Sequence, residues 1–164
     1  MLVVSDTTPV RALALSGRLE LLVHQFGSVV IPLVVRNELA RLPHEGGRAI
    51  IQASIAEGWI TVDSSPPSPL GIYLRGSLDP GEAAAIDLAC VRRADWLLMD
   101  EMAGRQAAAR LGLKVTGSLG VLLRAKADGS IVSLRQEIDR IRSEANFYIS
   151  EELEERVLKE AGEI

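Results

Sequence analysis

The sequence MLVVSDTTPV at residues 1–10 begins with a short, mostly apolar run, which ends at the carboxylate of Asp6. A run of this kind predicts a buried strand, because strands covered on both faces have near-continuous hydrophobic sequences. Open α/β folds bind their ligands at the carboxyl ends of the strands. Asp6 therefore lies where such a fold would hold a ligand.

A second apolar run shows the same pattern near residue 100. Residues 96–99 are apolar and lead directly into Asp100 and Glu101. Two strands that each end in an acid predict one acidic site built from distant parts of the chain.

Segments with strand and helix character alternate along the chain, working outward from these two runs. The predicted strands are residues 2–5, 28–31, 59–62, 96–99 and 114–116. The predicted helices are residues 9–16, 18–26, 33–42, 45–57, 79–93, 102–111, 118–127, 134–145 and 151–161. Residues 63–77, rich in Pro and Ser, are predicted to be an irregular loop. This alternation predicts a mostly parallel sheet covered by helices.

The composition is that of a folded protein. A chain of 164 residues fits one domain, and 48% hydrophobic with 24% charged residues argues against disorder. We expect residues 1–164 to form a single domain, with residues 132–164 as a helical extension that packs on the domain or on a partner. No apolar stretch is long enough to span a bilayer, so no membrane association is expected. The single Cys90 fits a reducing cytoplasm, which is the expected location.

The net charge of −4 by itself argues weakly against nucleic-acid binding. An acidic chain can still act on a polyanion if its carboxylates hold divalent cations, because the cation inverts the local charge. The question is therefore which other acids can reach Asp6 and Asp100.

Helical spacing places Glu38 on an apolar face. Glu38 lies four residues after Val34 and four before Leu42, so all three share one side of the predicted helix. A carboxylate on an inward face is costly unless it is paired or bound to a metal. Two interpretations stay open here: a site ligand, or a boundary residue that forms a salt bridge with an arginine such as Arg41.

Glu82 has two competing interpretations as well. It lies four residues before Ile86 on an inward stripe, which would suit a ligand. It also lies three residues after Asp79, so the pair could form a capping box at the start of the helix. A Glu82 bound to metal would not be free to cap. Asp87 lies off this stripe, and we expect it to be a solvated helix acid.

Acids from four separate segments could meet in a parallel topology: Asp6, Glu38, Glu82 and Asp100. Clustered carboxylates repel one another, and all-oxygen coordination suits Mg²⁺ or Mn²⁺. Glu101 could be a further ligand, and Thr7 or Thr8 could cap the next helix or hold a water or phosphate near Asp6. No zinc site is expected, because His24, His44 and Cys90 lie in unrelated segments.

Four motifs in order resemble the PIN domain family, in its prokaryotic VapC-like branch. They are residues 5–9 (SDTTP), 78–86 (LDPGEAAAI), 98–101 (LMDE) and 113–122 (LKVTGSLGVL). The resemblance covers most of the chain. It implies a Rossmann-like, three-layer α/β/α fold with about five strands and extra C-terminal helices.

The same resemblance implies a function. Family members are typically metal-dependent ribonucleases, often the toxin of a toxin–antitoxin pair, and their acidic quartet corresponds to Asp6, Glu38, Glu82 and Asp100. We therefore expect hydrolysis of RNA phosphodiester bonds with one or two Mg²⁺ or Mn²⁺ ions, an antitoxin partner and a homodimer. Many members carry Asp at the position of Glu82.

Two alternatives come from other classes of protein. The chain could be a PIN-fold binding or assembly module with weak catalysis, using its terminal helices as a partner surface. It could also be another Rossmann-like phosphohydrolase of the haloacid dehalogenase type. That class has a second Asp two residues after its nucleophile, where this chain has Thr8.

Overall fold

Five short strands form one parallel sheet in the computed structural model, which describes residues 1–164. The strands are β1 (Val3–Ser5), β2 (Val29–Pro32), β3 (Ile60–Asp63), β4 (Trp96–Leu98) and β5 (Val115–Thr116). Their order across the sheet is β3-β2-β1-β4-β5, and every neighbouring pair is parallel. The prediction of a parallel sheet with about five strands is confirmed.

The three central strands are buried on both faces. Val3 and Leu98 point to one hydrophobic cluster, whereas Val4 and Leu97 point to another. Successive side chains of a strand alternate between faces, so a strand covered on both sides needs apolar residues at every position. This explains why the central strands have uninterrupted apolar sequences.

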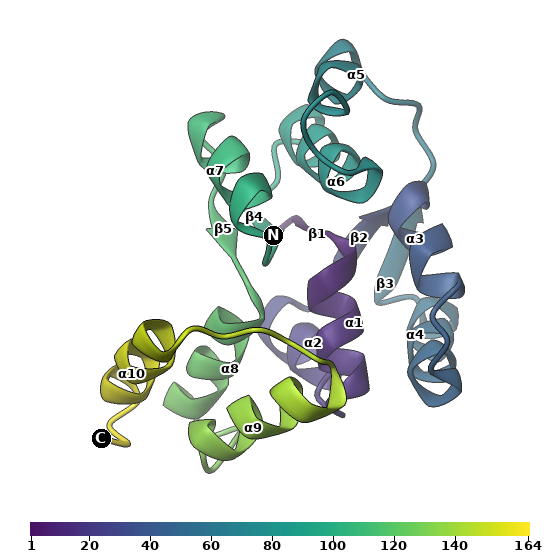
Figure 1. Ribbon diagram of the computed structural model, residues 1–164. Helices are drawn as coiled ribbons and strands as arrows, with labels where there is room; N and C mark the ends of the chain where they lie inside the picture. The colour runs from purple at the N-terminus through teal and green to yellow at the C-terminus, as the bar shows by residue number, and fades with distance from the viewer.

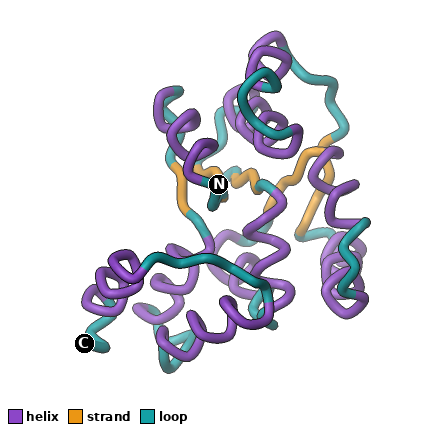
Figure 2. Tube along the Cα trace, viewed as in Figure 1, coloured by secondary structure: helices purple, strands orange, loops and turns teal.

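Helices cover the two faces of the sheet and make the fold a three-layer α/β/α sandwich (Figures 1 and 2). One face packs against α5 (Pro69–Leu74), α6 (Pro80–Val91) and α7 (Met102–Arg110). The larger cluster on the other face includes side chains from α1 (Thr7–Leu15), α2 (Glu20–Phe26), α3 (Leu33–Ala40), α4 (Glu45–Glu57), α8 (Ser118–Ala127), α9 (Leu134–Glu144) and α10 (Glu151–Glu160). None of these helices is long and apolar enough to cross a bilayer.

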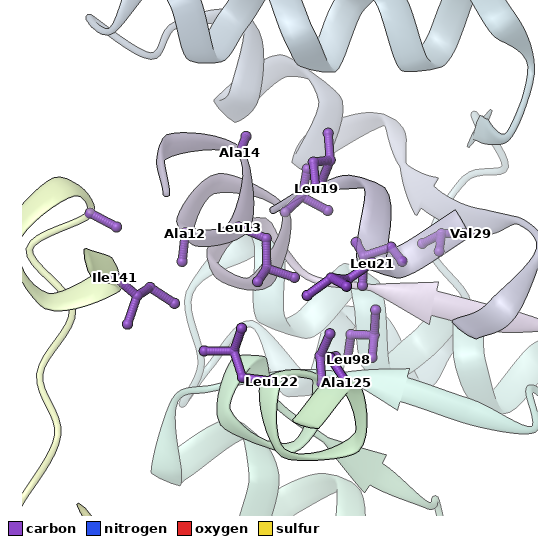
Figure 3. Close-up of a cluster of buried hydrophobic side chains, with 14 of the residues drawn as sticks. Ala12, Leu13, Ala14, Leu19, Leu21, Val29, Leu98, Leu122, Ala125 and Ile141 are labelled. Atoms are coloured by element: carbon purple, nitrogen blue, oxygen red, sulfur yellow. The ribbon is translucent and has the colours of Figure 1, made fainter. Parts of the chain in front are cut away.

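The larger cluster joins the two ends of the chain. Figure 3 shows Leu13 of α1, Leu98 of β4, Leu122 of α8 and Ile141 of α9 around one buried volume. Side chains of α10 belong to the same cluster through Val157 and Leu158. The C-terminal helices thus pack on the core that the N-terminal segment forms.

The order of the strands creates a switch point between β1 and β4. The chain moves outward from β1 through β2 to β3, then returns to place β4 on the other side of β1. Crevices at such points, outside the carboxyl ends of the strands, are where α/β sheets bind ligands. Ser5 pairs with Leu98, and the backbone N–H of Asp6 donates to Leu98 O at 3.0 Å. Asp6 and Asp100 therefore follow the two strands that flank the switch point.

Two details of local structure differ from the prediction. Helix α1 begins at Thr7 rather than at Pro9, because a proline in the first turn loses an N–H that has no partner there anyway. Residues 63–77 are not wholly irregular, since they contain α5. The backbone N–H and hydroxyl of Ser68, which precedes α5, donate to Asp87 of α6. All predicted strand and helix boundaries, including those of α1, lie within two residues of the observed ones.

Candidate active site

Asp6 lies at the centre of the site, between the end of β1 and the start of α1. Its side chain is only 3% exposed, and no basic side chain pairs with it. Burial raises the pKa of Asp6 to about 7, and the neighbouring charges of Asp79, Glu82 and Glu38 add to this rise. The Thr7 backbone N–H acts in the opposite direction. A buried carboxylate without a counter-charge is costly, so the site favours either a proton or a cation.

Glu38 reaches Asp6 from α3. Its Oε2 accepts a short hydrogen bond from the hydroxyl of Thr7. Two alternatives that the sequence left open are thereby decided: Glu38 forms no salt bridge with Arg41, and the Thr7 hydroxyl donates to Glu38 rather than capping α1. Thr8 is half-buried beside them in the first turn of α1.

Gly81 in the first turn of α6 lies against both carboxylates. A Cβ at this position would be 2.9 Å from Glu38 Oε1 and 3.2 Å from Asp6 Oδ1. Only a residue without a side chain lets α6 approach this closely. Asp6 and Glu38 are thereby brought to the same point beside the N-terminus of a helix.

Glu82 follows Gly81 and serves as the partner in a capping box. The Glu82 backbone N–H donates to Asp79 Oδ1 at 2.8 Å, and the Asp79 N–H donates to Glu82 Oε1 at 3.3 Å. The side chain is nonetheless buried, which raises the pKa of Glu82 to about 7, with the Asp79 and Glu101 charges adding. The structural interpretation of Asp79 and Glu82 is therefore realised, although Glu82 Oε2 takes no part in the box.

Asp100 is turned toward the start of α8. Its Oδ1 accepts from the Ser118 backbone N–H and its Oδ2 from the Ser118 hydroxyl, both at 2.7 Å. Burial raises the pKa of Asp100, while these hydrogen bonds and the nearby Arg105 act to lower it. Gly117 allows the approach, because a Cβ there would be 2.5 Å from Asp100 Oδ1.

The four predicted acids thus lie at one edge of the sheet but do not form one closed cage. Asp6 and Glu38 meet at Gly81, Glu82 borders them from α6, and Asp100 is tied to Ser118. Glu101 is exposed and acts electrostatically on Glu82 and Asp100.

Three further acids lie elsewhere. Asp63 at the end of β3 forms an ion pair with Arg92, at 3.3 Å, and is not part of the site. Asp87 is not the solvated acid we expected, since it is 6% exposed and holds Ser68. Asp95 lies at the opposite edge, where it accepts from Leu2 N at 2.6 Å.

The donor chemistry of the site fits a hard divalent cation. Asp6 and Glu82 are buried acids without basic partners, and all the available donors are oxygens. No group of three or more acidic, His or Cys side chains is close enough in the structure to hold a metal ion. Metal binding would therefore require side-chain rotations, above all of Glu82 away from its capping position.

Some contributors to the site were not singled out from the sequence. Gly81, Gly117 and Ser118 fall within the quoted motifs, but their roles depend on which side chains the fold brings against them. Arg105 donates to Met99 O at 2.8 Å and places a positive charge near Asp100. The sequence did offer one signal for Arg105: it lies four residues after Glu101 on the predicted helix, at the spacing that brings an acid and a base to the same helix face.

The fold and the site define a class: a three-layer α/β protein with acids at the switch point of its sheet. A family model described as PIN domain matches residues 2–163, so the chain belongs to the PIN domain family. No curated protein matches the chain.

The fold is similar to that of a solved structure, a PilT N-terminus domain protein from the hyperthermophilic archaeon Sulfolobus solfataricus. It is 19% identical, with a TM-score of 0.51, over 76% of this chain and 93% of that one. At this identity the likeness establishes the fold alone. PIN domains are typically nucleases that use divalent metals, and this chain is a nuclease-like module of that fold.

Proposed function

We propose that the protein is a metal-dependent ribonuclease that hydrolyses RNA phosphodiester bonds. The observation that carries the proposal is the buried, unpaired carboxylate of Asp6 at the switch point, with Glu38 and Glu82 adding charge beside it. Such a cluster is stabilised by a cation, and a cation in turn attracts a phosphate. Membership of the PIN domain family supports the same reaction class.

Each acid has a separate part in this proposal. Asp6 and Asp100 would hold a Mg²⁺ or Mn²⁺ ion directly, and Glu38 and Glu82 would complete the ligand set or hold a second ion. Asp100 can do so while bound to Ser118, because each carboxylate oxygen accepts more than one contact. Thr7 orients Glu38. The bound ion supplies polarisation of the phosphoryl oxygen and a water of lowered pKa.

Cleavage of single-stranded RNA tests the proposal. We expect the purified protein with Mn²⁺ to produce fragments with 5′-phosphate and 3′-hydroxyl ends, and EDTA to stop the reaction. Asp6→Asn should lower kcat/KM by at least about 100-fold, whereas the matched change Glu57→Gln, at an exposed acid of α4, should not. Cleavage that persists in EDTA and in Asp6→Asn would contradict the proposal.

A second candidate is a PIN-fold binding or assembly module with little catalysis. It is favoured by the lack of a preassembled metal-binding group and by the capping role of Glu82. Calorimetric titration with Mn²⁺ separates the two candidates, because a module of this kind would show no binding near millimolar concentration. Hydrolysis of p-nitrophenyl phosphate without cleavage of RNA would instead favour another phosphohydrolase.

The biological setting is a further part of the proposal: a toxin restrained by an antitoxin, acting as a homodimer. Expression of the wild-type chain in a bacterial host should then arrest growth, and the Asp6→Asn variant should not. A short overlapping upstream gene whose product restores growth would identify the antitoxin. Sedimentation at micromolar concentration tests the dimer.

A further inference from the structure

A cavity of about 270 Å³ lies outside the acidic site, at the carboxyl ends of β2 and β3. Its apolar walls come from α3 and α6, including Val34, Ala84 and Leu88. The loop that leads from β3 past α3 to α5 forms another wall (Figure 1), and Arg75 follows α5 at the rim. We call this space the α3–α6 cavity.

The α3–α6 cavity begins one helical turn from the acids. On α6, Gly81 contacts Glu38 and Asp6, and Ala84 lies three residues further along the same face. On α3, Val34 lines the cavity and lies four residues before Glu38. One turn of helix rises about 5.4 Å, so a ligand in the cavity would lie within about one nucleotide of a phosphate held at the acids.

The chemistry of the α3–α6 cavity suits a flat, mostly apolar ring. Its two acids already have partners, since Asp63 pairs with Arg92 and Asp87 accepts from Ser68. Arg75 is exposed at the rim and is not held in an ion pair. Unstacked bases of single-stranded RNA are recognised by stacking on aromatic side chains or on Arg guanidinium planes, and Arg75 offers such a plane beside the apolar walls of the cavity. Drug-sized ligands fill about 300–1,000 Å³, so this smaller space fits a single base.

We propose that the α3–α6 cavity binds the nucleobase of the RNA substrate next to the cleaved phosphate and so determines the preferred cleavage sequence. The inference rests on the proposed ribonuclease function for its biological meaning. The binding of a base can nevertheless be measured without any cleavage.

Methyl NMR of the full chain provides the binding test. The probes are the four nucleoside 5′-monophosphates and, as a control without a base, ribose 5-phosphate, each at millimolar concentration. We expect at least one nucleotide, but not ribose 5-phosphate, to shift the methyl signals of Val34 and Leu88. Arg75→Ala should weaken that binding about tenfold, the usual effect of losing one stacking partner. Arg156→Ala, at an exposed residue of α10, should leave it unchanged.

Ala84→Leu should abolish the nucleotide-induced shifts by filling the cavity, and thermal unfolding checks that this variant is folded. If it is not, Arg75→Ala at the surface still decides the question. If no nucleotide shifts these methyl signals, or ribose 5-phosphate shifts them equally, the inference is wrong, and an apolar segment of a partner becomes the occupant to test.

Cleavage of RNA with single abasic substitutions then separates this inference from the proposed function. We expect one abasic position beside the cleaved bond to lower kcat/KM about tenfold in the wild type and to have no effect in Arg75→Ala. If nucleotides bind but no RNA is cut, base binding by the α3–α6 cavity stands, whereas the ribonuclease proposal and the role of the cavity in cleavage preference both fail. If RNA is cut with no dependence on any flanking base, the cavity proposal fails and the ribonuclease stands.

Discussion

Asp6 combines burial with the absence of a counter-charge. A rise of its pKa from 3.8 to about 7 corresponds to roughly 4 kcal/mol between the two protonation states. Between these two pH values the folded state keeps a proton that the unfolded chain has lost. Folding stability without metal should therefore fall as pH rises through this window.

Removing the Asp6 charge should stabilise the metal-free protein at high pH. We expect Asp6→Asn to raise the melting temperature by about 5 °C at pH 8 in EDTA, and by less at pH 5, where the wild type is protonated. Mn²⁺ should stabilise the wild type and not the variant, because a ligand stabilises only the state that binds it. Differential scanning calorimetry measures both effects. A wild type that is more stable than Asp6→Asn at pH 8 in EDTA would show that burial of the ionised Asp6 carboxylate does not destabilise the folded protein.

Gly81 sets how closely α6 approaches the acids. In Gly81→Ala the new Cβ would push the flexible carboxylates of Glu38 and Asp6 apart, since it would lie 2.9 Å and 3.2 Å from their oxygens. We expect Mn²⁺ affinity to fall about tenfold while the melting temperature changes little, because alanine suits a helix better than glycine. The matched control is Gly46→Ala in α4, where the Cβ would meet only His44 at 3.4 Å. Equal Mn²⁺ affinity in the wild type and in Gly81→Ala would show that Gly81 has no role in metal binding.

At the scale of the element, α6 has two roles. Its first turn is fastened by the capping box of Asp79 and Glu82, and the same turn carries the acid that faces the site. The two roles compete for Glu82, because one carboxylate cannot both cap and rotate toward an ion.

Breaking the capping box should separate these roles. We expect Asp79→Ala to lower the free energy of unfolding by about 1 kcal/mol, and Asp79→Ser, which can still cap, to restore most of it. Urea denaturation measures the change. Glu82 Oε1 accepts from the backbone N–H of residue 79, which alanine retains, so Mn²⁺ affinity in Asp79→Ala should stay close to that of the wild type. A loss of affinity would show that Asp79 itself supports the metal.

At the scale of the whole molecule, the core connects the first helix to the last ones. Ile141 of α9 is completely buried in the cluster that includes Leu13 and Leu98. Residues 132–164 should therefore unfold together with the rest of the chain rather than as a separate unit.

Truncating Ile141 tests this cooperativity. We expect Ile141→Ala to lower the free energy of unfolding by about 2–5 kcal/mol, as for other large buried side chains. Val132→Ala, at an 89% exposed residue of the same region, should change it by less than about 0.5 kcal/mol. Tryptophan fluorescence and circular dichroism should report one coincident transition in denaturant. Two separate transitions would mean that the C-terminal helices form their own unit.

Much of the architecture could be predicted from the sequence, because it depends on local patterns. Uninterrupted apolar runs such as Val29–Pro32 mark strands buried on both faces, and their alternation with helices implies a parallel sheet. A parallel sheet places the carboxyl ends of β1 and β4 side by side, so Asp6 and Asp100 were predicted to lie at one edge. Helix α5 was not predicted, because the residue that precedes it, Ser68, donates to Asp87, which lies nineteen residues further along the chain.

The sequence by itself determined the parallel sheet and the acids at its carboxyl edge, since both follow from periodicity and the direction of the strands. Only the tertiary structure decided what Glu38 and Asp100 contact: Glu38 accepts from Thr7, and Asp100 accepts from Ser118. The physical reason is that hydrogen bonds and burial depend on side chains from distant segments. Those segments also leave Asp6 buried without a counter-charge, which is the feature that a cation would neutralise.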